Sequence, residues 1–249
     1  MAIVPAAART LAILRLLAEQ AAPLSAVTIA RHLGLARSTT YHLLDTLVHE
    51  GFVVHVPEEH RFALGLGSYE LGSGYSRQAP LQRVARVPLA SLVDATGHNA
   101  HLAVLHGSEV VYVIEERAKG RAALITDVGV RLPAQLTATG RAMLAALPKE
   151  HVRALFPDPA AFVTRTDRGP TSYSSLSRLL VETRRRGFSE EAGEVTHGFS
   201  SVGAAVVDHS AHPVAAVALT FPSDVRGDQL AASVVRTAHL LSRRLGARS

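Results

Sequence analysis

The feature that most constrains this chain is a helix, a tight turn and a second helix near the N-terminus. Ala30 is small enough for two helices to cross closely, and Gly34, four residues later, permits the positive φ of a sharp turn. Ser25 is a typical N-cap for the helix that ends at Gly34. The pattern predicts a following helix over about 37–50, which Gly51 ends.

Elements on both sides of this turn extend the pattern. An amphipathic helix is expected over residues 9–19, before a break at Pro23. Two β-rich runs, 52–56 and 61–64, flank a polar tip at 57–60 and predict a hairpin. Together these elements indicate a winged helix-turn-helix, which typically binds DNA. The alternative is an ordinary three-helix packing element with a solvated polar face.

The helix over 37–50 has two distinct faces. At 100° per residue, one face collects Thr40, Leu43, Leu44 and Leu47. The outward face carries short polar donors and an arginine, which suit base edges and phosphates in a major groove. We therefore expect DNA contacts from this face, its flank and nearby arginines: Arg9, Arg31, Arg37, Ser38, Thr39, Tyr41, His42 and Arg61.

The charge of the N-terminal region argues for more than one DNA-binding unit. The whole chain has a formal net charge of +5, but residues 1–75 contain five Arg, no Lys and six acidic residues, which gives −1. Contacts to phosphates dominate nonspecific DNA affinity. We therefore expect modest affinity from one such region and a need for at least two.

Composition narrows the class of protein. With 249 residues, 47% of them apolar, the chain is long enough for two modest domains, and it has no Cys. The lack of Cys excludes disulfide scaffolds, Cys-based zinc fingers and thiol nucleophiles. No apolar run is long enough to span a bilayer, and the N-terminus lacks a secretory signal pattern. We expect a cytoplasmic protein with no membrane partner.

The common enzyme motifs do not occur in the sequence. There is no Gly-x-Ser-x-Gly, His-Glu-x-x-His, Walker loop or Gly-x-Gly-x-x-Gly. His98, His101 and His106 lie close together along the chain, but on an alternating strand they need not converge on a zinc ion. We expect no enzyme activity, no cofactor and no metal.

The rest of the chain alternates β-rich and helical patterns. A Gly- and Ser-rich stretch at 65–76 marks the first boundary, and a helical connector with two prolines follows. Strands are expected at 101–105, 110–114, 122–127, 202–207 and 214–221, and a helix at 136–147.

Blocks spread over the whole chain, in order, match a known pattern. They are residues 8–14, 23–25, 29–35, 37–44, 47–52 and 61–65, then 97–113, 129–147 and 190–222. In these blocks the chain resembles the IclR-type transcriptional regulators. It departs from them at His42, where the family often has Arg, and at Thr28, where it often has Glu. The operator sequence therefore does not carry over.

The resemblance implies an α+β protein with two domains. These are an N-terminal winged helix-turn-helix at 1–75 and a C-terminal effector-binding domain at 96–249, joined by a linker helix at 76–95. The C-terminal domain would be GAF-like, with an antiparallel sheet. The resemblance also implies homodimers or homotetramers on pseudo-palindromic double-stranded operator DNA, with small organic acids, often aromatic, as effectors.

A candidate effector pocket combines helix chemistry with the resemblance. The start of the helix near residue 136 offers free backbone N–H groups to a carboxylate, beside Thr137, Ala138 and Thr139. These threonines also suit a purely capping role. The resemblance implies further pocket residues, and apolar walls are expected nearby: Glu191, Ser201, Ala218 and Thr220, with Leu124, Val128 and Leu132.

Ala218 gives the pocket its own character. Some relatives carry a hydroxyl at this position, so the methyl group predicts a larger or more apolar ligand than a two-carbon acid. A packed core without any ligand is the alternative for this region.

The sequence thus predicts a sequence-specific transcriptional regulator, a repressor or an activator, whose operator affinity changes with a bound effector. The change would be a population shift transmitted through the linker helix. Two other classes remain open. One is a small-molecule-binding enzyme with an accessory DNA-binding region, and the other is a constitutive DNA-binding protein with a ligand-free dimerisation domain.

Overall fold

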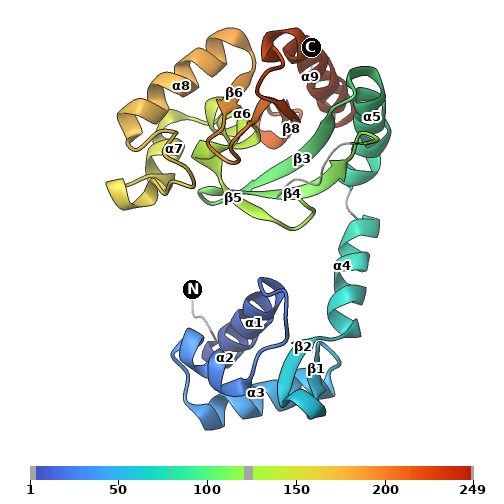
Figure 1. The fold of residues 1–249 in the computed structure, drawn as a ribbon, viewed down its shortest axis with the longest axis vertical. Helices are drawn as coiled ribbons and strands as arrows, with labels where there is room; N and C mark the ends of the chain where they lie inside the picture. The colour runs from blue at the N-terminus through green and yellow to red at the C-terminus, as the bar shows by residue number, and fades with distance from the viewer. Residues whose placement is uncertain (1–3, 79, 121–125, 248–249) are drawn as a thin grey trace. The chain divides into compact units, whose positions relative to one another are not determined.

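The structure, a computed structural model, describes residues 4–78, 80–120 and 126–247. The chain divides into two compact units, Met1–Ala79 and Pro80–Ser249, each with its own apolar core (Figure 1). Within the described ranges, no helix combines the length and apolar character that crossing a bilayer requires.

The N-terminal unit is a three-helix core with a hairpin and one further helix. Its elements are α1 (Pro5–Ala18), α2 (Ala26–Leu33), α3 (Arg37–His49), β1 (Val53–Val56), β2 (Arg61–Leu64) and α4 (Leu66–Gln78). Ile13, Ile29 and Leu44, one from each of the first three helices, are fully buried together. The helices expected at the turn are present, and α1 starts earlier than expected because Pro5 suits the first helical turn.

Local chemistry fixes the turn between α2 and α3. The Ser25 hydroxyl accepts a hydrogen bond from the Thr28 N–H at 3.2 Å and caps α2. Gly34 ends α2 with φ of 62°, a left-handed conformation that favours glycine. An isolated bridge joins Leu24 to Phe62, whose N–H donates to the Leu24 carbonyl at 2.8 Å, so the hairpin is tied to the chain before α2.

The Gly- and Ser-rich stretch that marked a boundary in the sequence forms most of α4. Its glycines allow close packing here. A Cβ on Gly65 would lie 2.4 Å from the Gly51 carbonyl oxygen, and the Gly67 N–H donates to that same oxygen at 3.0 Å. The Ser68 hydroxyl donates to the Phe52 carbonyl at 2.9 Å. The start of α4 is therefore fixed against the end of α3.

The second unit contains, among the described residues, a six-stranded antiparallel sheet in the order β5-β4-β3-β8-β7-β6. Its strands are β3 (Asn99–His106), β4 (Glu109–Glu116), β5 (Arg131–Pro133), β6 (Ser189–Ala192), β7 (Phe199–Val207) and β8 (Pro213–Pro222). The α+β class with an antiparallel C-terminal sheet is confirmed. Residues 122–125 of the expected third strand lie outside the described residues, and Thr126 and Asp127 are not in a strand.

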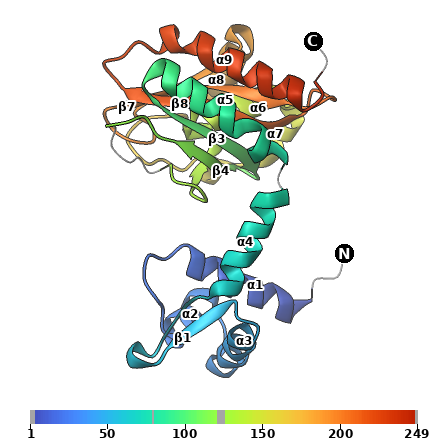
Figure 2. The same ribbon diagram turned by 90° about the vertical axis from the view of Figure 1, so that its right-hand side faces the viewer.

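Helices cover both faces of this sheet (Figure 2). On one face lie α5 (Pro80–Thr96) and α9 (Gly227–Arg244), and on the other lie α6 (Ala138–Ala146), α7 (Lys149–Leu155) and α8 (Tyr173–Arg186). Strand alternation separates the two cores, since Leu102 faces the first pair and Ala103 the second group. The single helix expected at 76–95 is instead the end of α4 and most of α5, and α5 packs on the sheet through Leu89 and Leu92.

Candidate functional site

Helix α3 presents a polar face to solvent. Its inner face buries Thr40, Leu44 and Leu47, and the Thr40 hydroxyl is satisfied by donating to the Ala36 carbonyl at 3.1 Å. The residues expected to contact DNA lie on the outside: Arg37, Ser38, Tyr41 and His42 are exposed and Thr39 is half-buried. Tyr41 keeps 47% of its surface accessible, which is unusual for an aromatic residue without a partner.

The start of α3 adds a feature that the sequence analysis missed. Its N-cap residue is Ala36, and no described side chain caps the first turn. The N–H groups of that turn and the positive end of the helix dipole are available to a phosphate. A helix that begins with Ala in place of Ser or Asp is the sequence signal for this.

The arginines expected around α3 differ in their surroundings. Arg9 and Arg31 are exposed. Arg61 is also exposed, but it donates to the Pro23 carbonyl at 3.1 Å and lies 4.0 Å from the Glu59 carboxylate. Its charge is therefore shared with the protein itself, at a hairpin tip that also carries Glu58.

In the second unit, a cavity lies between the start of α6 and the sheet. Most of the residues expected to hold an effector line it: Thr137, Ala138, Thr139, Glu191, Ser201, Ala218 and Thr220. The sequence analysis missed the others, namely His101, Tyr112, Thr126, Val195, Thr196 and Phe199. The empty space between these side chains is about 410 Å³, including the part that is open to solvent. Most of it is too narrow for solvent, because the centre of a water molecule can occupy only about 20 Å³ of it. A ring-sized ligand therefore requires side chains to move.

Two of the three expected apolar walls, Val128 and Leu132, do not line the cavity. Leu132 is buried in the core under β4 and β5, next to Val110, and does not line the cavity. Val128 is 63% exposed. Leu124 lies outside the described residues. Among the described residues, Val195 and Phe199 add apolar lining that the sequence analysis did not expect.

The floor of the cavity is a chain of polar groups across three strands. The Ser201 hydroxyl donates to Glu191 Oε1 at 2.8 Å and lies 2.9 Å from the Thr220 hydroxyl, because Ser201 pairs with both residues in the sheet register. Burial raises the pKa of Glu191 to about 8. Glu191 is therefore mostly protonated at neutral pH and can donate a hydrogen bond.

Helix α6 begins at the edge of this cavity. The Thr137 hydroxyl caps it by accepting from the Gly140 N–H at 2.9 Å. Gly203 on β7 lets the helix start sit against the sheet, since a Cβ there would lie 2.8 Å from the Ala138 carbonyl carbon. The positive end of the helix dipole is thus next to a cavity in which a carboxylate would be stabilised.

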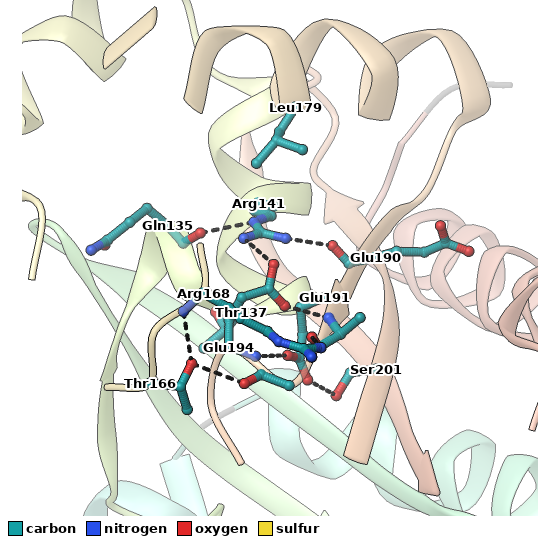
Figure 3. Close-up of polar contacts among 12 residues, drawn as sticks. Gln135, Thr137, Arg141, Thr166, Arg168, Leu179, Glu190, Glu191, Glu194 and Ser201 are labelled. Atoms are coloured by element: carbon teal, nitrogen blue, oxygen red, sulfur yellow. Dashed lines mark hydrogen bonds and ion pairs between the residues drawn. The ribbon is translucent and has the colours of Figure 1, made fainter. Parts of the chain in front are cut away.

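A buried arginine organises strand β6, which carries Glu191, and the turn after it, which carries Glu194 (Figure 3). Arg141 on α6 is 2% exposed and donates to the Gln135 carbonyl at 2.8 Å, the Glu190 carbonyl at 2.7 Å and Glu194 Oε1 at 2.9 Å. The other Glu194 oxygen accepts from the Ala192 N–H. Sequence reasoning missed Arg141, although an arginine within an apolar helical run was its signal.

The carboxyl groups of Glu191 and Glu194 have different charge states. Burial acts to raise the pKa of Glu194, but the Arg141 charge and the Ala192 N–H outweigh it, so that pKa lies below its ordinary value. Glu194 is ionised against Arg141 while Glu191, on the cavity side, keeps its proton. The cavity is therefore free of a full negative charge that would repel an anionic ligand.

Three histidines that are close in sequence, His98, His101 and His106, lie in different surroundings. His98 packs edge-on against Phe221, with ring centroids 5.8 Å apart. His101 lines the cavity, and His106 lies at the exposed end of β3, 3.1 Å from Arg131. In the part of the chain that the structure describes, no three metal-ligating side chains gather at one point.

Comparison with known proteins finds a matching family model for each of the two units. Residues 6–57 match the family model of the IclR helix-turn-helix domain, and residues 74–243 match that of the bacterial transcriptional regulator IclR C-terminal domain. The chain is 34% identical over 245 residues to the glycerol operon regulatory protein of Streptomyces coelicolor, covering 96% of this chain and 95% of that protein. It is 32% identical over 232 residues to the HTH-type transcriptional regulator XynR of Escherichia coli, covering 93% and 92%.

A solved structure has the same fold. It is an IclR homolog from Microbacterium hydrocarbonoxydans, complexed with 4-hydroxybenzoate, and it superimposes with a TM-score of 0.83 at 20% identity. The match covers 96% of this chain and 98% of that one.

Proposed function

Because the chain belongs to the IclR family of transcriptional regulators, with a helix-turn-helix DNA-binding domain and a ligand-binding C-terminal domain, we propose which surfaces perform each task. Helix α3 reads operator DNA. The cavity between α6 and the sheet takes a small organic acid, and its occupancy changes the affinity for that DNA.

The exposed face of α3 supports the DNA-binding assignment. Arg37, Ser38, Tyr41 and His42 are accessible while the opposite face of the helix is buried. Arg37 lies in the uncapped first turn, where N–H groups and a guanidinium can meet a phosphate or a guanine edge together. This is the observation that carries the proposal.

The charge of the N-terminal unit supports an oligomer on DNA. Residues 1–75 have a net charge of −1, and Arg61 shares its charge with Glu59. Few phosphates are neutralised by one unit, so tight binding requires at least two units on one duplex. We propose a homodimer or homotetramer on a pseudo-palindromic operator, acting in the cytoplasm where chromosomal DNA lies.

The chemistry of the cavity supports an acid as the ligand. The start of α6 and a protonated Glu191 offer donors to a carboxylate. The Thr137 and Thr139 hydroxyls donate within the chain only over 3.4 Å, to the Ala134 carbonyl and to Thr137, and could turn to a ligand instead. Val195 and Phe199 offer apolar contact to the remainder of the molecule. The structural relative solved with 4-hydroxybenzoate makes aromatic acids the first class to test.

The test of the DNA assignment compares three proteins on one duplex. Fluorescence anisotropy with DNA from the region upstream of the gene measures the affinity of the wild type, Arg37→Ala and the control Arg185→Ala, whose side chain is exposed on α8. We expect Arg37→Ala to weaken binding about tenfold or more, with an unchanged melting temperature, and the control to behave as wild type. Equal affinity of all three would overturn the assignment of α3.

The wild-type protein also allows a test of the alternative that the chain is a small-molecule-binding enzyme. Incubation with candidate acids, followed by analysis of the small molecules, detects turnover if the C-terminal unit is an enzyme. A regulator returns each acid unchanged.

A further inference from the structure

One side of the cavity holds polar groups without a hydrogen-bond partner among the described residues. His101 on β3 is 1% exposed, and neither of its ring nitrogens has a hydrogen-bond partner among the residues that the structure describes. The same is true, within those ranges, of the hydroxyl of Thr126. Both residues line the cavity. Buried polar atoms without partners are rare in native proteins, so a group from outside the chain is the natural partner.

The imidazole is neutral in this position. Burial, assisted by the positive charge of Arg117, lowers the pKa of His101 to about 4. A neutral imidazole presents one N–H donor and one acceptor nitrogen, and a threonine hydroxyl can donate and accept. The complementary group is therefore an uncharged hydroxyl, which also donates and accepts. A carboxylate would gain no opposite charge from this neutral ring.

The sheet register places His101 at a defined distance from the polar floor. His101 pairs with Ala218 on β8, and Ala218 pairs with Gly203 on β7. The Ser201–Thr220 pair lies two residues further along the same strands, which is about 7 Å for two strand residues on one face. Polar groups thus stand at two levels of the cavity, separated by roughly the length of a small molecule.

At the level of His101, the polar group comes from β3, because Ala218 on β8 has no polar side chain. The side chain at position 218 is a methyl group, so it contributes no hydrogen bond at this level. The ring of Tyr112 stands edge-on to the imidazole, with centroids 5.6 Å apart, and restricts how His101 can turn. His101 is therefore a rigid polar group next to a small, apolar neighbour.

We infer that His101 and Thr126 form a second polar anchor of the cavity, which binds an uncharged hydroxyl on a small carboxylic acid. The carboxylate end lies at the start of α6, which packs over Gly203 in the same row of sheet pairs as Ala218 and His101. The hydroxyl end reaches His101, two strands away, which is about 10 Å across the sheet. The inference rests on the proposed function, because it assigns the second group of the same ligand. It makes His101 the residue that selects hydroxylated acids over their plain counterparts.

The test measures this selection with matched acids. Isothermal titration of the full chain uses benzoate, 4-fluorobenzoate, 3-hydroxybenzoate and 4-hydroxybenzoate, together with propionate and lactate. We expect wild type to bind a hydroxylated acid about tenfold more tightly than its unhydroxylated match. In His101→Phe the ratio should fall to about one, because the phenyl ring fills the space without a polar atom. His106→Phe, the same change at the exposed end of β3, should keep the wild-type ratio.

Two further measurements keep the inference falsifiable. Thr126→Val preserves shape while removing the hydroxyl, so it should lower the selection ratio several-fold without affecting the fold. Ligand-free His101→Phe should melt at a higher temperature than wild type, since a buried donor and acceptor without partners are removed. A lower melting temperature would mean that His101 has a structural role instead.

The outcomes distinguish a failure of this inference from a failure of the proposed function on which it rests. If acids bind with the wild-type ratio in both His101→Phe and Thr126→Val, the second anchor is overturned and the ligand-binding function stands. If no acid in the panel binds to wild type, the proposed acid-binding function is overturned, and the second anchor falls with it.

Discussion

At the scale of the single residue, Arg141 stabilises the ligand-binding unit through charge. Its side chain is almost fully buried and donates two hydrogen bonds to Glu190 and Glu194, and a third to the Gln135 carbonyl before α6. Removing one partner of a buried ion pair leaves the other charge uncompensated, which is far more costly than the pair is worth.

We therefore expect Arg141→Met to lower the free energy of unfolding by about 3–5 kcal/mol in urea denaturation. The matched control is Arg185→Ala, which removes the exposed ion pair with Glu182 on α8. That change should leave the free energy of unfolding nearly unchanged, because solvent screens the pair. Similar losses in both variants would mean that the Arg141 network is not a buried charge pair.

Glu191 makes stability depend on pH in a stated direction. Its pKa rises from 4.5 to about 8 on folding, chiefly through burial, so between these values the folded state holds a proton that the unfolded state has lost. The stabilising proton is fully present below pH 4.5 and is lost as the pH rises through 8.

In ligand-free wild type we expect the contribution of Glu191 to decrease by up to about 1.4 kcal/mol per pH unit across this window. Glu191→Gln mimics the protonated side chain and should remove this decrease. His101, whose pKa falls from 6.5 to about 4 on folding, gives a slope of opposite sign below pH 6.5. Denaturation midpoints from pH 6.5 to pH 8 therefore check the contribution of Glu191. A slope as steep in the variant as in wild type would assign the effect to another group.

The sequence predicted which residues belong to the site better than it predicted which residues are buried. Glu191, Ser201 and Thr220 were expected in one site from the resemblance, and the structure places them within hydrogen-bonding reach of one another. Arg141 and His101 were missed, since their burial depends on strands and loops that are distant in sequence. No local pattern distinguishes a buried histidine from an exposed one.

At the scale of the element, the position of α6 depends on one glycine. Gly203 lets the first turn of α6 contact the backbone of β7, and a Cβ would lie 2.8 Å from both the Ala138 carbonyl carbon and its oxygen. Backbone atoms cannot move aside as a flexible side chain can. The helix start, and with it the carboxylate end of the cavity, would have to shift.

Gly203→Ala is accordingly expected to destabilise the protein by about 1–3 kcal/mol and to reduce the melting-temperature increase that a bound acid produces. Gly72→Ala is the control, because that glycine lies in α4 with nothing within 4 Å of the added Cβ. The control should be neutral or stabilising by up to about 1 kcal/mol. A fully retained ligand response in Gly203→Ala would argue against α6 as the carboxylate site.

Periodicity predicted most elements, and packing decided the rest. Helices α2 and α3 and the hairpins followed from caps, glycine stops and alternating residues. Helix α4 was missed because Gly and Ser have low helix propensity. Its formation depends on contacts of Gly65 and Gly67 with Gly51, which a local pattern does not contain.

At the scale of the whole molecule, charge and function are distributed unevenly. A net charge of +5 permits a nucleic-acid partner, yet residues 1–75 carry −1 and the excess lies in the rest of the chain. The proposed DNA recognition therefore rests on the shape and the polar face of α3. Part of the excess is used internally, as Arg141 is at Glu194.

An acid bound in the cavity is proposed to alter operator binding by the other unit. The most direct measurement is the anisotropy-based affinity of the full chain for its upstream DNA, with and without a saturating acid that raises the melting temperature. We expect the affinity to change by about five- to 150-fold, the usual range of coupling between two sites. An acid that binds and stabilises the protein but leaves its DNA affinity unchanged would contradict the claim.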